Sequence, residues 1–203
     1  EIDWEGDDDF YNPIVGSTCT INLYDTDTCN YDDFYTADER EYKVKVSYQD
    51  GSSNYQTYWE GWLLVDRFRE AVLTKPYPIS LSAYDGLGSL RGFTAPIDLT
   101  STAFKDLMYY ITNILNNINL GFDIHIANDI QKDGASGSDH TIYDQSSLSP
   151  NAFLQNGEKL RTAKDVLEQI LRFTNAKIFQ SYGKWYIINN SSYSEQSVKD
   201  SSA

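Results

Sequence analysis

Four aspartates near the start of the chain have the chemistry of a calcium site, and they are Asp25, Asp27, Asp32 and Asp33. Carboxylate oxygens are preferred Ca²⁺ ligands, and an EF-hand loop that begins at Asp25 needs Gly at its sixth position and Glu at its twelfth. Those positions hold Asn30 and Thr36, so the motif fails. The alternatives are a looser calcium site and a solvated acidic loop. We expect the acidic loop, with no metal site.

A Ser-His-Asp hydrolase site is the second chemistry that the residue types suggest. His140 follows Asp139, and Ser136 and Ser138 lie just before them. No nucleophile-elbow pattern surrounds these serines, and no Gly-rich phosphate-binding motif with its lysine is present. The other histidine, His125, is expected to lie at the surface or to pack in a strand. We therefore expect no enzymatic activity, no catalytic residue and no cofactor.

Aromatic residues make up 14% of the chain, and 16 residues are tyrosines. Tyrosine and tryptophan favour strands and surfaces that are half apolar and half wet. The rings that could form a sugar platform are Tyr55, Tyr58, Trp59 and Trp62. Strand alternation divides them between two faces. The alternatives are therefore a core or protein interface and a carbohydrate-binding module on this Tyr- and Trp-rich strand face. We expect an interface, with the candidates Tyr58, Trp59, Trp62, Tyr84 and Trp185.

The net charge of the chain is −14, and residues 1–50 hold 14 acidic residues against 3 basic ones. Binding to a phosphate backbone is driven by Lys and Arg, so this chain should not bind nucleic acid. Its acidity suits solubility, cation binding or the repulsion of nucleic acid. No apolar run approaches the roughly 18 residues of a membrane helix, so we expect no membrane insertion. For Cys19 and Cys29, a disulfide and two free thiols both stay open.

Alternating apolar residues predict strands in the first part of the chain and at its end. Strands are expected within 1–27, in a hairpin over 41–65 that turns at Asp50-Gly51, and over 79–85. Together they predict an antiparallel, barrel-like sheet. A C-terminal hairpin is expected over 177–189, about Tyr182-Gly183.

Apolar residues at helical spacing predict two amphipathic helices, over 102–120 and 162–174. Thr162 followed by Asp165 resembles a capping box at the start of the second helix. Each helix precedes a strand, which favours a repeated helix-then-strand unit. Residues 128–158 are rich in Asp, Gly, Ser and Asn and are predicted to form a long loop. The fold class is therefore α+β, with the two helices packed on sheet.

Three parts of the chain follow from these patterns. Residues 1–98 are the β-rich, tube-like portion, residues 99–190 hold the pair of helix-strand units with the long loop, and residues 191–203 are a polar tail. The chain opens on an alternating strand pattern rather than on Met. We therefore expect it to be a piece of a longer protein.

Five stretches, in a fixed order, carry a resemblance to a known class of protein. They are DDDFYNPIVGSTCTINL at 7–23, YTADEREYKVKV at 35–46, YWEGWLLVDRF at 58–68, PYPISLSAYDGLGSL at 76–90 and DVLEQILRFTNAKIFQSYGKWYIIN at 165–189. In this order they resemble the central hub of a phage tail tip or baseplate, in the form found in tailed phages and prophages of Bacteroidetes-type bacteria. No single stretch is a functional motif, so the specificity lies in their order.

The resemblance implies a structural role in the virion, after assembly in the bacterial cytoplasm. Hub proteins of this kind resemble tail-tube subunits, and they form a ring, often a trimer, that joins the tail tube to the tip or spike. DNA passes through the ring without specific binding. Acidic walls would repel its phosphates, and the channel-lining candidates are Asp7, Asp8, Asp9, Asp32 and Asp33. No catalytic residue is implied.

Overall fold

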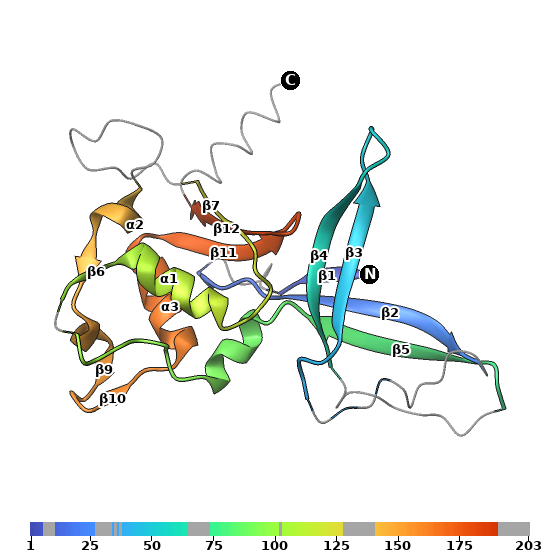
Figure 1. The fold of residues 1–203 in the computed structure, drawn as a ribbon, viewed down its shortest axis with the longest axis horizontal. Helices are drawn as coiled ribbons and strands as arrows, with labels where there is room; N and C mark the ends of the chain where they lie inside the picture. Colours follow the sequence, from blue (N-terminus) through green and yellow to red (C-terminus); the bar gives the residue numbers. More distant parts are fainter. Residues whose placement is uncertain are drawn as a thin grey trace.

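The structure is a computed structural model that describes residues 1–5, 11–26, 34, 36, 38–64, 74–101, 103–127 and 141–190. Its helices and largely antiparallel sheets confirm the predicted α+β class. Two regions lie side by side (Figure 1). We call strands β1 to β5, within 2–84, the N-terminal sheet, and the elements within 87–189 the helical module. No helix of the described ranges is long and apolar enough to cross a membrane.

The N-terminal sheet has the strand order β1-β2-β5-β4-β3, and every neighbouring pair is antiparallel. Its strands are β1 (Ile2–Trp4), β2 (Ser17–Asp25), β3 (Lys43–Gln49), β4 (Tyr55–Leu63) and β5 (Tyr77–Tyr84). Alternation explains them: along β5, every second residue from Tyr77 to Ala83 is buried, and the residues between are more exposed. The predicted hairpin over 41–65 is confirmed as β3 and β4.

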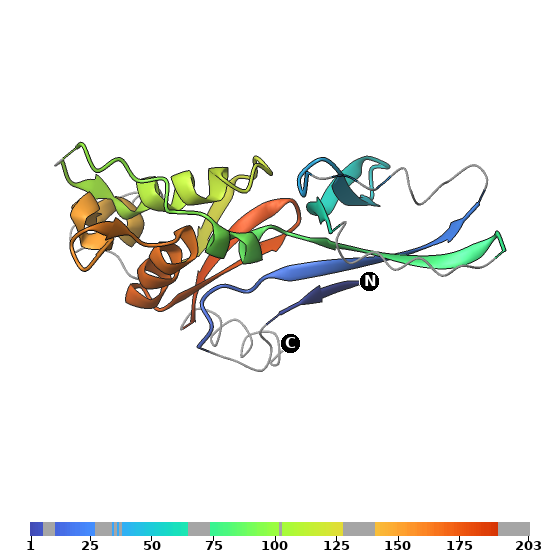
Figure 2. The same ribbon diagram turned by 90° about the horizontal axis from the view of Figure 1, so that it is seen from below.

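Two ribbons diverge within this sheet. β2 and β5 pair over eight residues, whereas β4 meets β5 at only two, Tyr84 and Ala83. The β3–β4 ribbon therefore points away from the β2–β5 ribbon (Figure 1), and β2 and β5 extend far from the helices (Figure 2). A β-bulge interrupts the β3–β4 ribbon between Val46 and Ser47, where Tyr58 has no partner in the register.

The helical module packs two helices over a three-stranded sheet. The helices are α1 (Leu107–Asn116) and α3 (Ala163–Phe173), and the strands are β7 (Ile124–Ala127), β11 (Ala176–Ser181) and β12 (Lys184–Asn189). β12 is central, antiparallel to β11 and parallel to β7. The C-terminal hairpin is confirmed, and each helix does precede a strand of this sheet. The module begins with a 3₁₀ helix, η3 (Leu87–Gly92), which follows β5.

The helix α1 is shorter than the predicted range 102–120. Residues Lys105–Asp106 form the short strand β6, which pairs with β8 (Ser147–Leu148), so the helix begins after Asp106. The helix α3 agrees closely with its prediction. The backbone N–H of Asp165 donates to the Thr162 side chain at 3.1 Å, which caps its N-terminus as the sequence indicated.

Part of the predicted loop over 128–158 is structured. Residues 141–158 contain α2 (Ile142–Gln145), η4 (Pro150–Phe153) and β9 (Leu154–Gln155), and β9 pairs with β10 (Lys159–Leu160). The composition is polar, but the buried side chains of Tyr143 and Phe153 anchor the segment to the core, and the Tyr143 hydroxyl lies 2.8 Å from Thr174 Oγ1. Residues 128–140 lie outside the described ranges.

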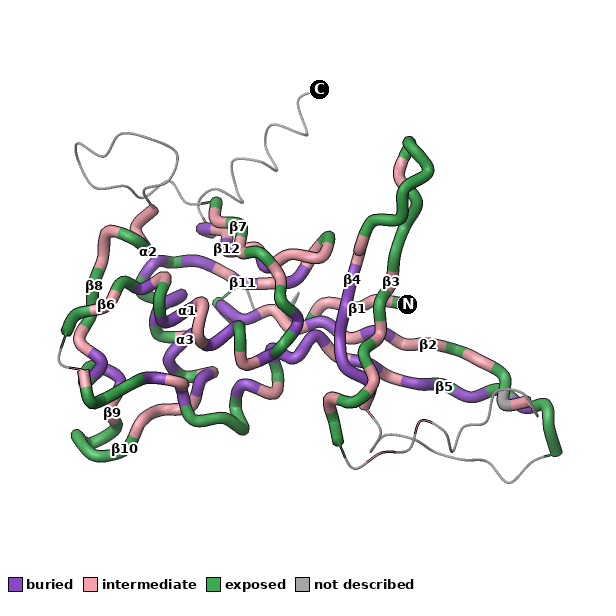
Figure 3. Tube along the Cα trace, viewed as in Figure 1, coloured by how far each residue is buried: buried purple, intermediate pink, exposed green. Residues whose placement is uncertain are grey.

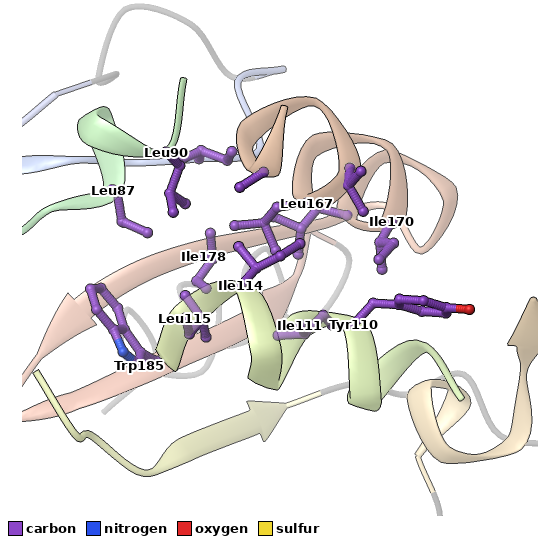
Figure 4. Close-up of a cluster of buried hydrophobic side chains, with 14 of the residues drawn as sticks. Leu87, Leu90, Tyr110, Ile111, Ile114, Leu115, Leu167, Ile170, Ile178 and Trp185 are labelled. Carbon is purple, nitrogen blue, oxygen red and sulfur yellow. The ribbon is translucent and has the colours of Figure 1, made fainter. Parts of the chain in front are cut away.

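The main core lies in the helical module. Side chains of α1, α3, β11 and β12 interdigitate there, among them Ile114, Leu167 and Trp185 (Figure 4). The same cluster includes Leu87, Leu90, Ala95 and Ile97, which precede the boundary that the sequence placed after residue 98. The burial trace shows buried segments in the module, at its junction with the sheet and along β5 as far as Tyr77, while the tip of the β3–β4 ribbon is exposed (Figure 3).

Candidate functional site

Three of the five interface candidates are buried inside the chain. Trp59 is 0% exposed, Trp185 is 1% exposed and Trp62 is 5% exposed. Each indole fills a core: Trp62 and Trp185 lie in the main cluster, and Trp59 packs with Cys19 and Ala83. Their ring area is therefore occupied within the monomer and is not presented to a partner. Cys19 itself is a buried free thiol, and burial raises its pKa.

The indole N–H groups of two of these residues tie the sheet to its surroundings. Trp62 Nε1 donates to the carbonyl of Ile118 at 3.0 Å, across to the helical module. Trp59 Nε1 donates to Ser17 Oγ at 2.9 Å. The Trp59 ring lies over Gly61, where an added Cβ would come within 2.3 Å of ring atom Cη2.

The other two interface candidates, Tyr58 and Tyr84, are half-buried. Tyr84 packs against the main core, and burial raises the pKa of its hydroxyl, with the nearby Glu39 charge adding to the shift. Tyr58 contacts other rings and belongs to the surface described below. His125 lies exposed on β7, as expected.

Several candidates lie outside the described residues, and their predictions stay predictions. They are Asp7, Asp8, Asp9, Asp27, Asp32, Asp33, Cys29, Ser136, Ser138, Asp139 and His140. Within the ranges that the structure describes, no group of three or more His, Cys, Asp or Glu residues could hold a metal ion.

A hollow of about 360 Å³ opens where two hairpins meet, and we call it the tyrosine hollow. Its lining residues are Tyr48, Gln56, Thr57, Tyr182, Gly183, Lys184 and Tyr186. The first three come from the β3–β4 ribbon, and the other four from the β11–β12 hairpin of the helical module. The hollow is thus formed by both regions of the molecule.

Three tyrosines beside this hollow contact one another edge to face. The ring centroids of Tyr58 and Tyr182 are 5.2 Å apart, those of Tyr48 and Tyr182 are 5.8 Å apart, and those of Tyr48 and Tyr58 are 6.3 Å apart. Such pairs contribute about 0.5–1.5 kcal/mol beyond their buried area. Tyr48 is still 41% exposed and Tyr182 is 53% exposed, so both residues remain partly accessible to solvent.

The aromatic surface continues across the three-stranded sheet. On its face away from the buried core, Phe179 stacks on Tyr186 with centroids 5.7 Å apart, and His125 lies 5.6 Å from Tyr186 on the other side. These residues are cross-strand neighbours on β11, β12 and β7. Tyr186 therefore joins this row to the hollow.

The turn that carries Tyr182 is strained for a tyrosine. Tyr182 has φ 48° and Gly183 has φ 66°, as in a type I′ turn, where Asn, Asp or Gly is favoured at the first central position. A bulky residue in this left-handed region costs roughly 1–2 kcal/mol. Gly183 is required for a second reason, because a Cβ there would lie 2.9 Å from Thr57 Cβ. The turn thus presses directly on the β3–β4 ribbon.

Lys184 supplies the positive charge in the hollow. Within the described part of the chain, its ammonium has no ion-pair partner. By contrast, Lys43 and Lys45 both pair with Glu60, at 3.8 and 3.3 Å, on the same ribbon. The hollow therefore combines apolar ring faces, hydroxyl groups and one unpaired cation.

Behind the hollow, one glutamine joins the two regions. Gln180 of β11 accepts from the Glu60 backbone N–H at 3.0 Å and donates to the Glu60 carbonyl at 2.7 Å. The backbone carbonyl of Gln180 accepts a hydrogen bond from Trp4 Nε1 at 3.1 Å. Gln180 is fully buried. Its side chain therefore supplies the hydrogen bonds that the Glu60 N–H and carbonyl of β4 lose to water when they are buried.

The carboxyl group of Asp85 is buried between the end of β5 and the start of η3. Asp85 accepts from the N–H and hydroxyl of Ser17 at 2.7 and 2.8 Å and from the N–H of Leu87 at 3.0 Å. Burial raises its pKa to about 6, the nearby charge of Glu5 adds to the rise, and the three hydrogen bonds oppose it. The Ser17 hydroxyl also accepts from Trp59, so the carboxyl belongs to a fully bonded chain.

The sequence patterns do not predict the tyrosine hollow. They predict a hairpin over 41–65 and another about Tyr182-Gly183, but these hairpins are far apart in the chain and nothing local indicates that they meet. One local signal was present: a tyrosine precedes Gly183, where a type I′ turn favours Asn or Asp.

No protein-family model and no curated protein matches the chain. Among solved structures, the chain is similar to the prophage tail protein gp18 from Listeria monocytogenes EGD-e, with 9% sequence identity and a TM-score of 0.36. The match covers 74% of this chain and 41% of that chain, so this chain spans less than half of that protein's length. A similarity of this size establishes neither a shared fold nor a shared function.

Proposed function

We propose that this chain is part of a structural protein of a phage tail, in the hub of the tail tip or baseplate. The observation that carries the proposal is the ordered series of five stretches between residues 7 and 189 that resembles such hubs. In this role the full-length protein forms a trimeric ring in the virion. The ring joins the tail tube to the tip or spike, and DNA passes without specific binding. The role includes no enzymatic activity, no cofactor and no membrane insertion.

The distribution of exposed apolar residues supports self-association. A closed ring needs head-to-tail contacts between two different patches. At one end of the molecule, the β2–β5 ribbon exposes Tyr24, which is 65% exposed. At the opposite end, around β6 and β8, Phe104, Tyr109 and Leu148 are 69%, 39% and 38% exposed (Figure 3). Exposed apolar patches commonly mark interfaces, so the group around β6 and β8 is the candidate for one contact, and Tyr24 is a single exposed ring that its counterpart could include.

The oligomeric state of the full-length protein tests this proposal. We expect a trimer by mass photometry and a ring by cryo-electron microscopy. The double variant Phe104→Ser with Leu148→Ser should shift the protein toward monomer. Phe173→Ser is the matched control, because Phe173 is 70% exposed on α3, outside this patch. A stable full-length monomer, or a twofold dimer with one self-complementary interface, would contradict the hub role.

The acidic candidates allow a second, separate test. If Asp7, Asp8 and Asp9 line the channel, their replacement by Asn in the assembled ring should raise its affinity for DNA at low salt, because repulsion of phosphates is removed. An unchanged affinity would place these residues away from the channel and would leave the trimer proposal standing.

The carbohydrate-binding alternative cannot use the strand face on which the sequence placed it. A platform on the strand face would use Tyr55, Tyr58, Trp59 and Trp62, but both tryptophans lie in the core. Replacing either by Ala would therefore test folding rather than binding. Any sugar site of this chain must use other rings.

A further inference from the structure

The tyrosine hollow combines features that its structural role does not require. Tyr48 and Tyr182 contact each other, yet each leaves about half of its side chain exposed. Tyr182 is held in a left-handed backbone conformation that favours a smaller polar residue. Lys184 contributes an unpaired ammonium among the described residues, in a protein whose acidic residues outnumber its basic ones by 30 to 16.

These groups define the chemistry of a ligand. Tyrosine rings offer an apolar face and a hydroxyl that donates and accepts hydrogen bonds. The apolar C–H face of a pyranose can pack on the tyrosine ring, and the sugar hydroxyl groups can hydrogen-bond with the tyrosine hydroxyl. Lys184 is half-buried as a residue, and its ammonium favours a carboxylate as a charge-assisted hydrogen-bond partner. We propose that the tyrosine hollow binds a saccharide whose pyranose unit carries a carboxylate, such as a uronic acid.

The size and the charge of the site agree with this ligand. A volume of about 360 Å³ lies at the lower end of the range for small-molecule sites, which is about 300–1,000 Å³. The chain's net charge of −14 repels anions at long range. At physiological salt, that repulsion is screened beyond about 8 Å, so the ammonium of Lys184 dominates for a ligand in contact with it.

The proposal rests on the hollow alone and stands whether or not the chain belongs to a phage tail. Its failure would leave the proposed hub role untouched, because the two use different residues and different readouts. Ring formation uses the ends of the molecule, whereas this site lies at the meeting of the β3–β4 ribbon and the β11–β12 hairpin.

A titration with two matched sugars tests the proposal. The intact 203-residue chain is titrated with a galacturonic acid tetrasaccharide and with its fully methyl-esterified form, which has the same rings without the charge. Amide shifts of Thr57 and Gly183 in heteronuclear NMR report binding at the hollow. We expect saturable binding of the acid form, with a dissociation constant of about 1 mM or tighter, and at least tenfold weaker binding of the ester.

Four variants separate the roles of ring and charge. Tyr182→Asn, which suits the turn, should weaken binding of the acid form at least tenfold. Lys184→Gln should weaken it about tenfold and remove the preference over the ester. The controls are Tyr24→Asn, an exposed tyrosine on the β2–β5 ribbon, and Lys159→Gln, an exposed lysine on β10. Both controls should stay within twofold of the wild type.

Three results would overturn the inference. The first is that neither sugar produces saturable amide shifts at Thr57 and Gly183. Another is equal affinity for acid and ester, which removes the carboxylate from the recognition. The third is unchanged binding in Tyr182→Asn while its circular dichroism matches the wild type, which places the sugar elsewhere.

Discussion

The helical module and the N-terminal sheet are stabilised in different ways. Among the residues that the structure describes, one continuous cluster of 24 buried residues fills the module and reaches into the junction, whereas the sheet has two separate clusters of four and three buried residues. Among these residues, the ribbons therefore bury fewer apolar side chains than the module does. Their position depends on the polar anchors at the junction, above all Gln180 and Asp85. The module therefore acts as the support, and the ribbons are attached to it at a few points.

The largest contrast should appear when one side chain is truncated in each region. Leu167→Ala, in the fully buried part of α3, should lower the free energy of unfolding by about 2–5 kcal/mol. Val46→Ala, half-buried on β3, should lower it by about 1 kcal/mol. Urea denaturation followed by circular dichroism measures both. Equal losses would mean that the ribbon is as tightly packed as the module.

The buried carboxyl at the junction makes the comparison depend on pH. Because the pKa of Asp85 is raised to about 6, the folded state holds this proton more tightly than the unfolded chain. Its contribution to stability is therefore full below about pH 4 and is lost as the pH rises through about 6. Between pH 4 and 6.5, the wild type should lose on the order of 2–3 kcal/mol relative to Asp85→Asn. Urea unfolding of both proteins across this range gives the difference, and parallel pH curves would contradict it.

Removing the other anchor should loosen the ribbon from the module. Gln180→Ala leaves the buried N–H and carbonyl of Glu60 without their partners, at a cost of about 1–3 kcal/mol. Hydrogen exchange of the Glu60 amide should speed up by more than that of amides in α3. Gln56→Ala is the control, because the hydrogen bond that the Gln56 amide donates to Asp50 is exposed to solvent, and it should cost less than about 0.5 kcal/mol. Protection of the Glu60 amide in the Gln180 variant would argue against a point attachment.

The smallest effect is expected at the turn between the regions. Tyr182→Asn loses the edge contacts to Tyr48 and Tyr58 but relieves the left-handed strain, so the free energy of unfolding should change by less than about 0.5 kcal/mol. Thermal and urea unfolding check this. A loss above about 2 kcal/mol would show that the Tyr182 ring stabilises the fold by packing and is a third attachment of the ribbon to the module.

The elements were largely predictable because each has a local cause. The helix α3 has its cap at Thr162 and an apolar stripe, and the C-terminal hairpin turns at Tyr182-Gly183, as predicted. The start of α1 was misplaced because β6, just before it, pairs with β8 about 40 residues away, and that contact has no local signal. The structured part of 141–158 was missed because two buried aromatic anchors, Tyr143 and Phe153, outweigh its polar composition.

The candidate site was less predictable than the elements. Alternation correctly divided Trp59 from Trp62, but it did not say that both faces are covered. Trp62 is covered by the module and Trp59 by the sheet's own strands, and both contacts are long-range. The tyrosine hollow depends on two hairpins that meet only in the folded chain. A count of aromatic residues can therefore indicate that rings will gather, but not where.

The close approach of the Trp59 ring to Gly61 has a consequence for sequence divergence. A side chain at position 61 would collide with the indole and also with the Tyr84 carbonyl, 2.3 Å from the added Cβ. A larger residue at position 61 is therefore not tolerated while Trp59 is present. Replacing Trp59 alone by a smaller residue would leave a cavity where the indole was. Positions 59 and 61 therefore constrain each other. Even if Trp59 changed, the Tyr84 carbonyl of β5 would still exclude a side chain at position 61. In any set of relatives, position 61 should thus vary last within this strand.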